Sequence, residues 1–190
     1  MEGKLFVISG ASGVGKSTVL GKVMAARKDL CFSVSATTRP PRPGERDGVD
    51  YYFITKEKFG EMVRQGAFVE YDCHAKACYG TPEQQLKEKM ERSHVLLDIE
   101  PNGAFAVRAK RPDATLIFIM PPSAEILEQR LRSRGDTSED QIRLRLERAK
   151  WEMEQRFRYD YVVTNDRADA CADQILNIIA RIAGNEESEE

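Results

Sequence analysis

The sequence predicts an α/β fold: a P-loop parallel sheet flanked by helices, with a small mixed α/β insert and a helical lid. Three observations indicate this. A short apolar run, residues 5–8, precedes a glycine-rich loop, and apolar residues at helical spacing follow the loop. Further apolar runs alternate with helical segments, as in parallel sheets whose two faces are covered by helices. The segment over residues 35–79 breaks that alternation with several short strands in succession.

The glycine-rich loop, residues 10–17, reads Gly-Ala-Ser-Gly-Val-Gly-Lys-Ser and fits the phosphate-loop pattern G-x-x-x-x-G-K-[ST]. Strand, loop and helix together aim backbone N–H groups and the positive helix end at one point, which suits a polyphosphate. Lys16 can reach the β- and γ-phosphates, and the Ser17 hydroxyl can ligate Mg²⁺. The alternative is a glycine-rich turn without function, but the complete motif in this context favours a nucleoside triphosphate site.

The remaining strands follow from short apolar runs bounded by turn residues. We expect them at residues 32–35, 51–54, 67–71, 95–99, 115–120 and 161–164. The first helix should end near Lys28. The proline-rich segment over 37–44 cannot be a helix or a central strand, so we expect an ordered loop or an edge there.

The helices follow from start signals and apolar spacing. Thr55 is the expected N-cap of a short helix over 56–64, and Ser123 opens a helix that runs to about Ser133. Thr81, followed by Pro82, is expected to cap another helix. The last two helices are expected from Ser138 toward Phe157 and over 168–183.

We expect a single domain over residues 1–190, because a chain of this length can bury one core. Its expected parts are a core over about 1–34, 84–130 and 156–185, an insert over about 35–83, a lid over about 131–155 and an acidic tail over 184–190. An insert beside a phosphate loop is a suitable place for a second substrate.

Composition is ordinary, with 41% hydrophobic and 32% charged residues and a net charge of −2. This balance gives no indication of nucleic-acid or membrane binding. No apolar stretch approaches transmembrane length and no signal peptide is seen, so a cytoplasmic location is expected. The oligomeric state stays open.

The four cysteines, Cys31, Cys73, Cys78 and Cys171, do not have the spacing of a zinc site. Cys73, His74 and Cys78 lie close together in the sequence, but a fourth ligand is not evident. We therefore expect no structural metal, and we expect no disulfide framework.

Four features outside the loop could carry chemistry. Arg39 and Arg42 lie in a proline-rich segment whose prolines fix the backbone, so their guanidinium groups could bind a phosphate at little ordering cost. Two solvated arginines are the alternative. Glu70 offers two acceptors, which match the adjacent N1–H and N2 amino donors of guanine, although the sequence alone shows only a half-buried strand residue.

The third feature is a set of arginines on two helices that meet at residues 135–137. It comprises Arg130, Arg132, Arg134, Arg143, Arg145 and Arg148. A solvated helical face explains most of them, and a mobile lid could bring one or two onto a transferring phosphate. The fourth feature is Asp98 at the carboxyl end of an apolar strand, where ligands gather in open α/β sheets. A strand-end turn cap is its alternative.

These segments together resemble the guanylate kinase family over about residues 3–183. The most specific part is residues 32–45, Phe-Ser-Val-Ser-Ala-Thr-Thr-Arg-Pro-Pro-Arg-Pro-Gly-Glu, followed by Gly-Val-Asp-Tyr-Tyr-Phe at 48–53. The resemblance implies phosphoryl transfer from ATP to GMP, and to dGMP, with Mg²⁺. It also implies roles for individual residues of this sequence.

The resemblance implies that Ser35 and Glu70 bind the guanine edge and that Asn165 contacts the adenine of ATP. The residues implied for GMP binding are Ser35, Arg39, Arg42, Tyr51, Glu70, Tyr79, Gly80, Thr81, Asp98 and Glu100. Those implied for ATP binding are Ala11, Ser12, Gly13, Val14, Gly15, Lys16, Ser17, Thr18, Asn165 and Asp166. The expected catalytic residues are Lys16, Arg42, Arg134 and Arg145, and Ser17 is the expected Mg²⁺ ligand.

The chain departs from the family pattern at three positions. Glu100 and Asn102 stand where Asp and Gln are usual, and Cys78 replaces the first Tyr of N-Y-Y-G-T. Two other functions remain open: a kinase for a different small phosphorylated acceptor on the same scaffold, and a guanylate-kinase-like interaction module. Ser35, Glu70 and the Arg39–Arg42 loop argue against the first. The complete phosphate loop argues against the second.

Overall fold

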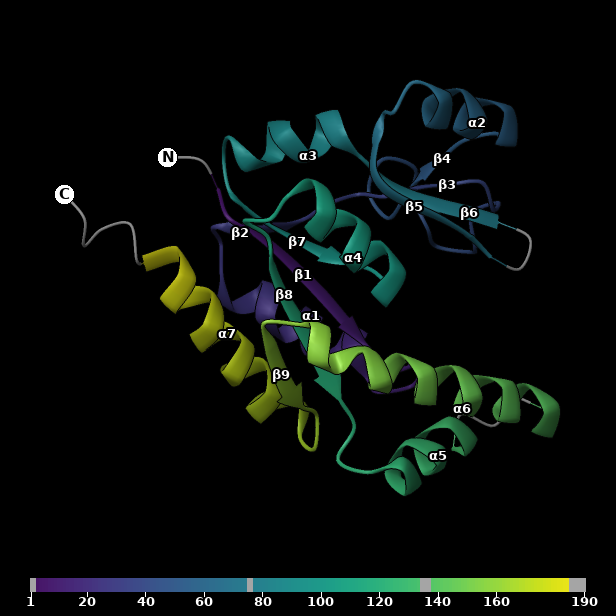
Figure 1. Cartoon of the computed structure of the whole chain (residues 1–190), viewed down its shortest axis with the longest axis vertical. Coiled ribbons are helices and arrows are strands. Elements are labelled where there is room, and N and C mark those ends of the chain that lie inside the picture. The colour runs from purple at the N-terminus through teal and green to yellow at the C-terminus, as the bar shows by residue number, and fades with distance from the viewer. Residues whose placement is uncertain (1–2, 75–76, 134–137, 185–190) are drawn as a thin grey trace. The chain divides into compact units, whose positions relative to one another are not determined.

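The computed structural model describes residues 3–74, 77–133 and 138–184 (Figure 1). The strands are β1 (Leu5–Gly10), β2 (Leu30–Phe32), β3 (Ala36–Thr37), β4 (Tyr52–Phe53), β5 (Phe68–His74), β6 (Ala77–Pro82), β7 (His94–Asp98), β8 (Thr115–Met120) and β9 (Tyr161–Thr164). The helices are α1 (Lys16–Ala26), α2 (Lys56–Arg64), α3 (Glu83–Met90), α4 (Pro101–Lys110), α5 (Ala124–Arg132), α6 (Glu139–Glu154) and α7 (Ala168–Gly184), with a 3-10 turn η1 (Gln155–Arg158).

The strands form two sheets. One has the order β2-β7-β1-β8-β9, in which β1 pairs in parallel with β8, β8 with β9, and β2 with β7. The other has the order β4-β3-β6-β5. The predicted parallel sheet with alternating helices is confirmed, and the short strands of the insert do form a separate small sheet.

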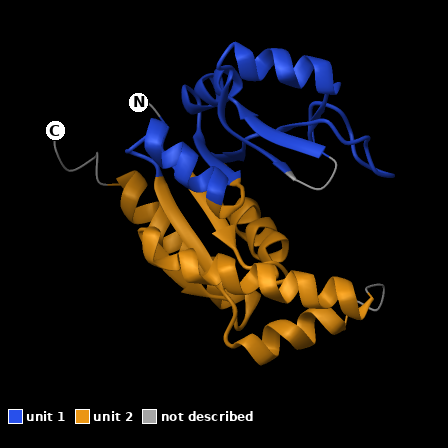
Figure 2. Ribbon diagram, turned by 45° about the vertical axis from the view of Figure 1, so that its right-hand side comes forward, with its two compact units in different colours: residues 1–5, 29–97, 102–114 blue, residues 6–28, 98–101, 115–190 orange. Residues whose placement is uncertain are grey.

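The chain divides into two compact units, coloured separately in Figure 2. Unit 1 contains residues 1–5, 29–97 and 102–114, and unit 2 contains residues 6–28, 98–101 and 115–190. The insert thus belongs to a larger unit that also holds β2, β7, α3 and α4. The division into core, insert and lid expected from the sequence stays a prediction.

Unit 2 is organised around two buried and mostly apolar strands. All six residues of β1 are buried, and so are the first five of β8. A strand buried on both faces reads as a continuous apolar run, which explains why these two were predicted from the sequence. Their carboxyl ends, with that of β9, lead into the phosphate loop, Pro121 and Asn165, so polar loops gather at one edge of this sheet.

The small sheet of unit 1 is mixed. β3 pairs in parallel with β4 and antiparallel with β6, and β5 pairs antiparallel with β6. Ala36, Phe59 and Phe68 form its buried core, and the rings of Phe59 and Phe68 stack with centroids 4.6 Å apart. Helix α2 begins after Thr55, whose side chain accepts from the Lys58 N–H, as predicted.

Two local predictions were wrong, and two elements were not predicted at all. Residues 32–35 are not one strand: β2 ends at Phe32 and pairs with β7, whereas β3 begins at Ala36 in the other sheet, so the chain changes sheets between them. Thr81 does not cap α3, because it belongs to β6 and its hydroxyl is used elsewhere. Helix α4 and strand β6 were not predicted, although Pro101 at the first helical position was a signal for α4.

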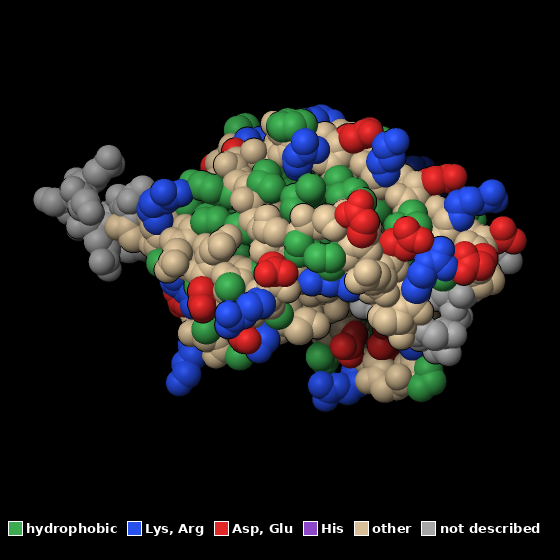
Figure 3. Space-filling view, turned by 90° about the horizontal axis from the view of Figure 1, so that it is seen from below, with side chains coloured by type: hydrophobic (Ala, Val, Ile, Leu, Met, Phe, Trp, Pro, Cys, Tyr) green, Lys and Arg blue, Asp and Glu red, His purple; other side chains and the backbone are tan. Residues whose placement is uncertain are grey.

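Among the described residues, no helix is long and apolar enough to cross a membrane. Figure 3 shows Lys and Arg side chains interspersed with Asp and Glu on the face that it draws, rather than gathered in a patch of one sign.

A pair of glycine substitutions tests the packing of unit 1. At Gly80 in β6, an added Cβ would lie 2.9 Å from Phe68 Cδ1 and 3.1 Å from the Glu70 carbonyl oxygen. Gly80→Ala should therefore lower the free energy of unfolding by about 1–3 kcal/mol. At Gly60 in α2, the nearest atom to an added Cβ is Arg64 Nη1 at 3.6 Å. Gly60→Ala should therefore raise the free energy of unfolding by about 0.5–1 kcal/mol. Urea titrations of both variants measure this, and equal effects would contradict the packing described.

Candidate active site

The phosphate loop joins β1 to α1 and depends on two glycines with positive φ. Gly13 has φ 87° and Gly15, the N-cap of α1, has φ 91°. These left-handed angles favour glycine. Space adds a second requirement, because a Cβ at Gly13 would lie 2.5 Å from Leu131 Cδ2, and one at Gly15 would lie 2.9 Å from Asn165 Nδ2. Side chains of α5 and of the loop after β9 therefore press on this backbone from outside.

A cavity of about 380 Å³ opens in front of the loop, within unit 2. Residues 10–17 form one wall. The other lining residues are three carboxylates and two arginines: Asp98, Glu100, Glu152, Arg145 and Arg148. The predicted loop residues, Lys16 and Arg145 thus share one cavity, whose lining can offer both cations and backbone N–H groups to a polyphosphate.

Lys16 and Asp98 form an ion pair with 2.5 Å between Nζ and Oδ1. The segment after Asp98 is fixed to β1 by two hydrogen bonds. Ser9 Oγ donates to the Ile99 carbonyl at 2.7 Å, and the Ile99 N–H donates to the Ile8 carbonyl at 3.2 Å. Asp98 is therefore held beside the phosphate loop, where it can orient the Lys16 ammonium.

Arg145 projects from α6 to the phosphate loop, and its Nε lies 3.4 Å from Ser12 Oγ. Its position in the cavity wall distinguishes it from Arg143 on the same helix, which is largely exposed and lies 3.8 Å from Asp140. The other predicted lid arginine, Arg134, lies outside the described residues, as does the turn at 135–137.

Glu152 of α6 is a buried carboxylate in the same wall, with a side chain 4% exposed. Its Oε2 accepts from the Ser12 N–H at 2.7 Å, and its Oε1 accepts from Arg148 Nε at 3.1 Å. Burial raises the pKa of Glu152, while the Ser12 N–H and Arg148 act against that shift. Arg148 also forms an ion pair with Glu100.

A second cavity of about 300 Å³ in unit 2 is also lined by residues 13–15 of the loop. Its lining includes Thr18 and the predicted adenine-site residues Asn165 and Asp166. Asn165 is buried, its Nδ2 donates to the Val14 carbonyl at 2.8 Å, and its Oδ1 has no hydrogen-bond partner among the described residues. Arg130 connects the phosphate loop to the segment after β9, because it donates to the carbonyls of Val14 and Asn165 at 3.2 and 2.9 Å.

Eight of the predicted GMP residues lie in unit 1, and Asp98 and Glu100 lie in unit 2. In unit 1 the central group is Glu70 of β5, which is 6% exposed. Thr81 Oγ1 donates to Glu70 Oε1 at 2.6 Å across the β5–β6 pair. Burial raises the pKa of Glu70, and the hydrogen bonds from Thr81 oppose that shift.

Arg39 is bound by a carboxylate that the sequence analysis gave no role. Its Nη1 and Nη2 each donate to Glu45 at 2.6 Å, and its guanidinium lies 4.9 Å from the centroid of the Tyr51 ring. Hydrogen bonds from Arg39 and from the Arg42 backbone lower the pKa of Glu45 to about 2. The arginine fork is thereby held in one orientation.

The other predicted GMP residues of unit 1 have the following positions and contacts. The Tyr51 and Tyr79 rings meet edge to face with centroids 6.1 Å apart. Arg42 has an exposed side chain, and its N–H donates to Glu45 Oε2 at 2.8 Å. The Ser35 carbonyl accepts from the Tyr52 N–H, and Gly80 pairs with Ala36 across β6 and β3. Unit 1 thus contains a buried carboxylate and Tyr79 on its small sheet, and two arginines and Tyr51 in the segment between β3 and β4.

The sequence and the structure are both similar to known proteins. The model of the guanylate kinase family matches residues 2–182. The chain belongs to the guanylate kinase family. Guanylate kinases from Thermus thermophilus and Oceanobacillus iheyensis are 47% and 42% identical to it, over 94% of this chain in both cases and over 81% and 87% of theirs.

Solved structures agree with the family. The guanylate kinase of Anaplasma phagocytophilum is 33% identical and superposes with a TM-score of 0.76, covering 96% of this chain and 87% of that one. A gluconokinase from Sinorhizobium meliloti has a TM-score of 0.52 at 14% identity, covering 98% and 97%, and shares the fold alone. The predicted resemblance to guanylate kinases is confirmed.

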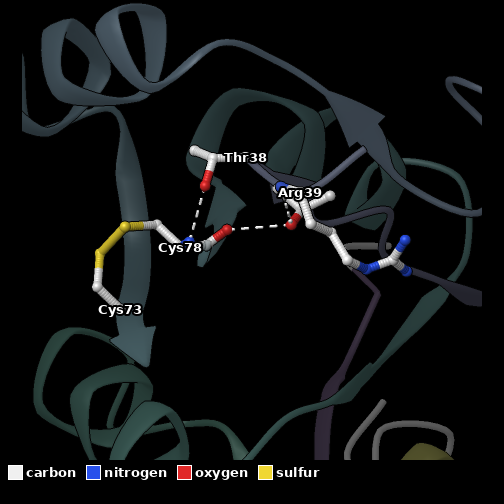
Figure 4. The surroundings of a disulfide bond; sticks show 5 residues. Thr38, Arg39, Cys73 and Cys78 are labelled. Carbon is white, nitrogen blue, oxygen red and sulfur yellow. Dashed lines mark hydrogen bonds between the residues drawn. A yellow bond between two sulfur atoms is a disulfide. The ribbon is translucent and has the colours of Figure 1, made fainter. Parts of the chain in front are cut away.

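One expectation about the cysteines was wrong, because Cys73 and Cys78 form a disulfide (Figure 4). The two residues pair directly across β5 and β6, which brings their side chains together. The Cys78 N–H donates to Thr38 Oγ1 at 2.9 Å, and its carbonyl accepts from the hydroxyl of Thr37 at 3.1 Å. Sequence spacing could not reveal this, since a disulfide depends on strand register.

Two members of the site, Glu45 and Glu152, were not singled out by the sequence analysis. Two others, Arg130 and Arg148, were named only within the set of arginines and received no individual role. Glu45 lies within the segment most specific to guanylate kinases, and Glu152 follows Arg148 by four residues on a helix, a spacing that favours an ion pair. Among the described residues, no group of three or more His, Cys, Asp or Glu side chains could hold a metal ion by itself.

The disulfide predicts a redox dependence of stability. Closing the short loop between residues 73 and 78 restricts the unfolded chain, so reduction should lower the free energy of unfolding by about 2 kcal/mol. Thermal melts with and without dithiothreitol measure this. The Cys73→Ser/Cys78→Ser variant is the control and should not respond to the reductant. A wild-type melt that is insensitive to dithiothreitol, with two free thiols by titration, would contradict the pairing.

Proposed function

We propose that the chain binds ATP at the phosphate loop of unit 2 and GMP on the small sheet of unit 1, and that it transfers the γ-phosphoryl group of ATP to GMP or dGMP. Membership of the guanylate kinase family supports this. The observation that carries it is the presence of two sets of residues: in unit 2 a complete phosphate loop with Lys16 and Arg145 around one cavity, and in unit 1 a buried Glu70 and an Arg39 guanidinium held by Glu45.

Binding of ATP is supported by the two cavities that the phosphate loop helps to line. The larger one offers Lys16, Arg145 and the N–H groups of residues 10–17 to the phosphates. The second one contains Asn165, whose buried Oδ1 is an acceptor that suits an amino group such as that of adenine.

Recognition of GMP is supported by the acceptors of Glu70. An ionised carboxylate accepts two hydrogen bonds side by side, as the N1–H and N2 amino group of guanine require. Thr81 fixes one carboxylate oxygen, which orients the group in the sheet. Arg39 and Arg42 offer their guanidinium groups to the GMP phosphate, and Tyr51 and Tyr79 offer hydroxyls. Asp98 and Glu100 stay predicted GMP residues.

The protein's part in the chemistry is positioning and charge stabilisation. In phosphoryl transfer, an attacking oxygen approaches the γ-phosphorus in line with the leaving oxygen. Lys16 and Arg145 stabilise the charge on the transferred group, and the same role is proposed for Arg134 and Arg42. Asp98 holds the Lys16 ammonium until the phosphates replace it.

Mg²⁺ suits the same cavity, because Ser17 and Asp98 provide oxygen ligands beside the loop, and Mg²⁺ is commonly bound by one or two protein oxygens with substrate phosphates. Ser17 would hold the ion together with ATP, and the ion would neutralise phosphate charge. A cytoplasmic location stays a prediction that cell fractionation can test.

A coupled assay of ADP release separates the proposed function from its alternatives. The assay compares GMP, dGMP, AMP and CMP as acceptors with a reaction that lacks an acceptor. Release that requires GMP or dGMP supports the proposal. Release with AMP or CMP alone would indicate another monophosphate kinase, and no release would indicate an interaction module.

Lys16→Ala should abolish most GMP phosphorylation. Removal of one charged group aimed at the β- and γ-phosphates should lower kcat/KM roughly 100-fold or more. Stability should change little, because the Lys16–Asp98 pair is partly exposed, with side chains 21% and 37% accessible. The coupled assay and a thermal melt are the measurements. Wild-type turnover at saturating ATP would contradict the role assigned to the loop.

Glu70 should give GMP binding a pH dependence. Because burial raises its pKa, Glu70 gains a proton at a higher pH than an ordinary glutamate and loses an acceptor for guanine. KM for GMP should therefore rise as the pH falls through this raised pKa, and be lowest above it. Glu70→Gln should raise KM for GMP, lower the GMP-to-AMP activity ratio and remove this acid-side dependence. If KM for GMP in the variant kept the same pH dependence as in the wild type, another residue would have to bind the guanine edge.

Arg145 should act in the transition state more than in binding. Arginines delivered to a transferring phosphoryl group contribute about 10³–10⁵ in rate. Arg145→Ala should thus lower kcat by a factor of about 10³ with a small change in the equilibrium Kd for GMP, and Arg145→Lys should recover only part. Arg143→Ala is the matched control on the same helix. Arg134→Ala is expected to behave like Arg145→Ala, and near-normal turnover of both would contradict a lid role.

A further inference from the structure

Arg148 lies in the wall of the phosphate-loop cavity and is held by two carboxylates. Its Nε donates to Glu152 Oε1 at 3.1 Å, and its Nη2 pairs with Glu100 Oε2. The guanidinium is therefore fixed at both its Nε side and its outer end. The phosphate role of Arg145 does not explain why a second arginine of α6 reaches the same cavity.

The two carboxylates differ in their freedom to release Arg148. The Glu152 side chain is 4% exposed, whereas that of Glu100 is 40% exposed. Glu152 also accepts from the partly buried Ser12 N–H at 2.7 Å, so moving it would break this hydrogen bond as well. An exposed ion pair such as Arg148–Glu100 contributes little, so another anion can replace Glu100 at Nη2 at little cost.

Glu152 thus links the phosphate loop to Arg148. One of its oxygens binds the backbone at Ser12, and the other binds Arg148 at Nε, which sets the direction of the guanidinium relative to the loop. The outer nitrogens of an arginine fork suit phosphate oxygens well, because they can donate two parallel hydrogen bonds.

We propose that Arg148 is a further phosphate-contacting residue of the triphosphate site, and that Glu152 is the positioning residue that holds it against the phosphate loop. On binding, a phosphate oxygen of the triphosphate replaces Glu100 at Nη2, while Glu152 keeps Nε. The inference rests on the proposed function, because it takes the loop to bind ATP.

A simpler role for Arg148 is to neutralise the two acidic side chains. The two roles predict opposite results for Glu152→Gln. If Glu152 positions Arg148, its loss should weaken ATP binding, since the glutamine amide cannot accept from Nε while its oxygen keeps the Ser12 N–H. If only charge matters, removing a negative charge beside a triphosphate should tighten ATP binding.

The experiment measures the Kd for ATP without GMP, and kcat and KM for ATP with GMP, on the full chain. Arg148→Ala should raise Kd and KM for ATP roughly tenfold or more, as expected for a hydrogen bond to a charged group. Arg148→Lys should restore only part of the ATP affinity, because an ammonium cannot both bind Glu152 and present a fork to the phosphate. Arg143→Ala, on the exposed side of α6, is the control and should match the wild type.

Glu152→Gln should also raise Kd for ATP, and the Arg148→Ala/Glu152→Gln double variant should be no worse than Arg148→Ala alone. Tighter ATP binding by Glu152→Gln, full rescue by Arg148→Lys, or wild-type constants for Arg148→Ala would overturn the inference. If Glu152→Gln does not fold, the Arg148 series decides alone, because that side chain is 42% exposed.

The binding measurement separates this inference from the proposed function. A wild-type chain that phosphorylates GMP while Arg148→Ala is unchanged refutes the role of Arg148 only. A wild-type chain that binds ATP without phosphorylating GMP refutes the proposed reaction, and the ATP Kd of the variants still tests Arg148.

Discussion

The need for glycine at two positions of the phosphate loop is the constraint on which the nucleotide site depends. Gly13 and Gly15 have positive φ, and neither leaves room for a side chain. The loop is held from outside at several points: Leu131 packs on Gly13, Asn165 and Arg130 bind the Val14 carbonyl, and Glu152 binds the Ser12 N–H. Residues far along the chain therefore keep the N–H groups of the loop aimed at one point.

Carboxylates hold the cations of the site in defined positions in both units. Asp98 binds Lys16, Glu152 binds Arg148, and Glu45 binds Arg39 through two hydrogen bonds. Such pairs restrict long side chains that would otherwise sample many rotamers, so less ordering is required when an anion binds. Exposure decides which carboxylate can give way: Asp98 and Glu100 are partly exposed, whereas Glu152 is buried.

In unit 1, the carboxylate proposed to bind guanine is also held in place by its neighbours. Glu70 is buried in a small sheet, which raises its pKa, and Thr81 fixes one of its oxygens. The strand that carries Thr81 also carries Cys78, which is tied by a disulfide to β5 and by hydrogen bonds to Thr37 and Thr38. The segment that leads to Arg39 is thus hydrogen-bonded to β6, and β6 is joined to β5 by the disulfide.

The sequence by itself determined the parallel sheet, the mixed insert, the phosphate loop and the family. These depend on local patterns: apolar runs such as β1 and β8 are buried on both faces, and the loop motif is contiguous. Only the tertiary structure decided which side chains meet across long separations, such as Glu152 with Ser12, Arg130 with Val14 and Cys73 with Cys78. Thr81 is the clearest case, because its local sequence is typical of a helix cap, yet strand pairing with β5 places its hydroxyl on Glu70. A local pattern carries no information on strand register or helix packing, and these contacts depend on both.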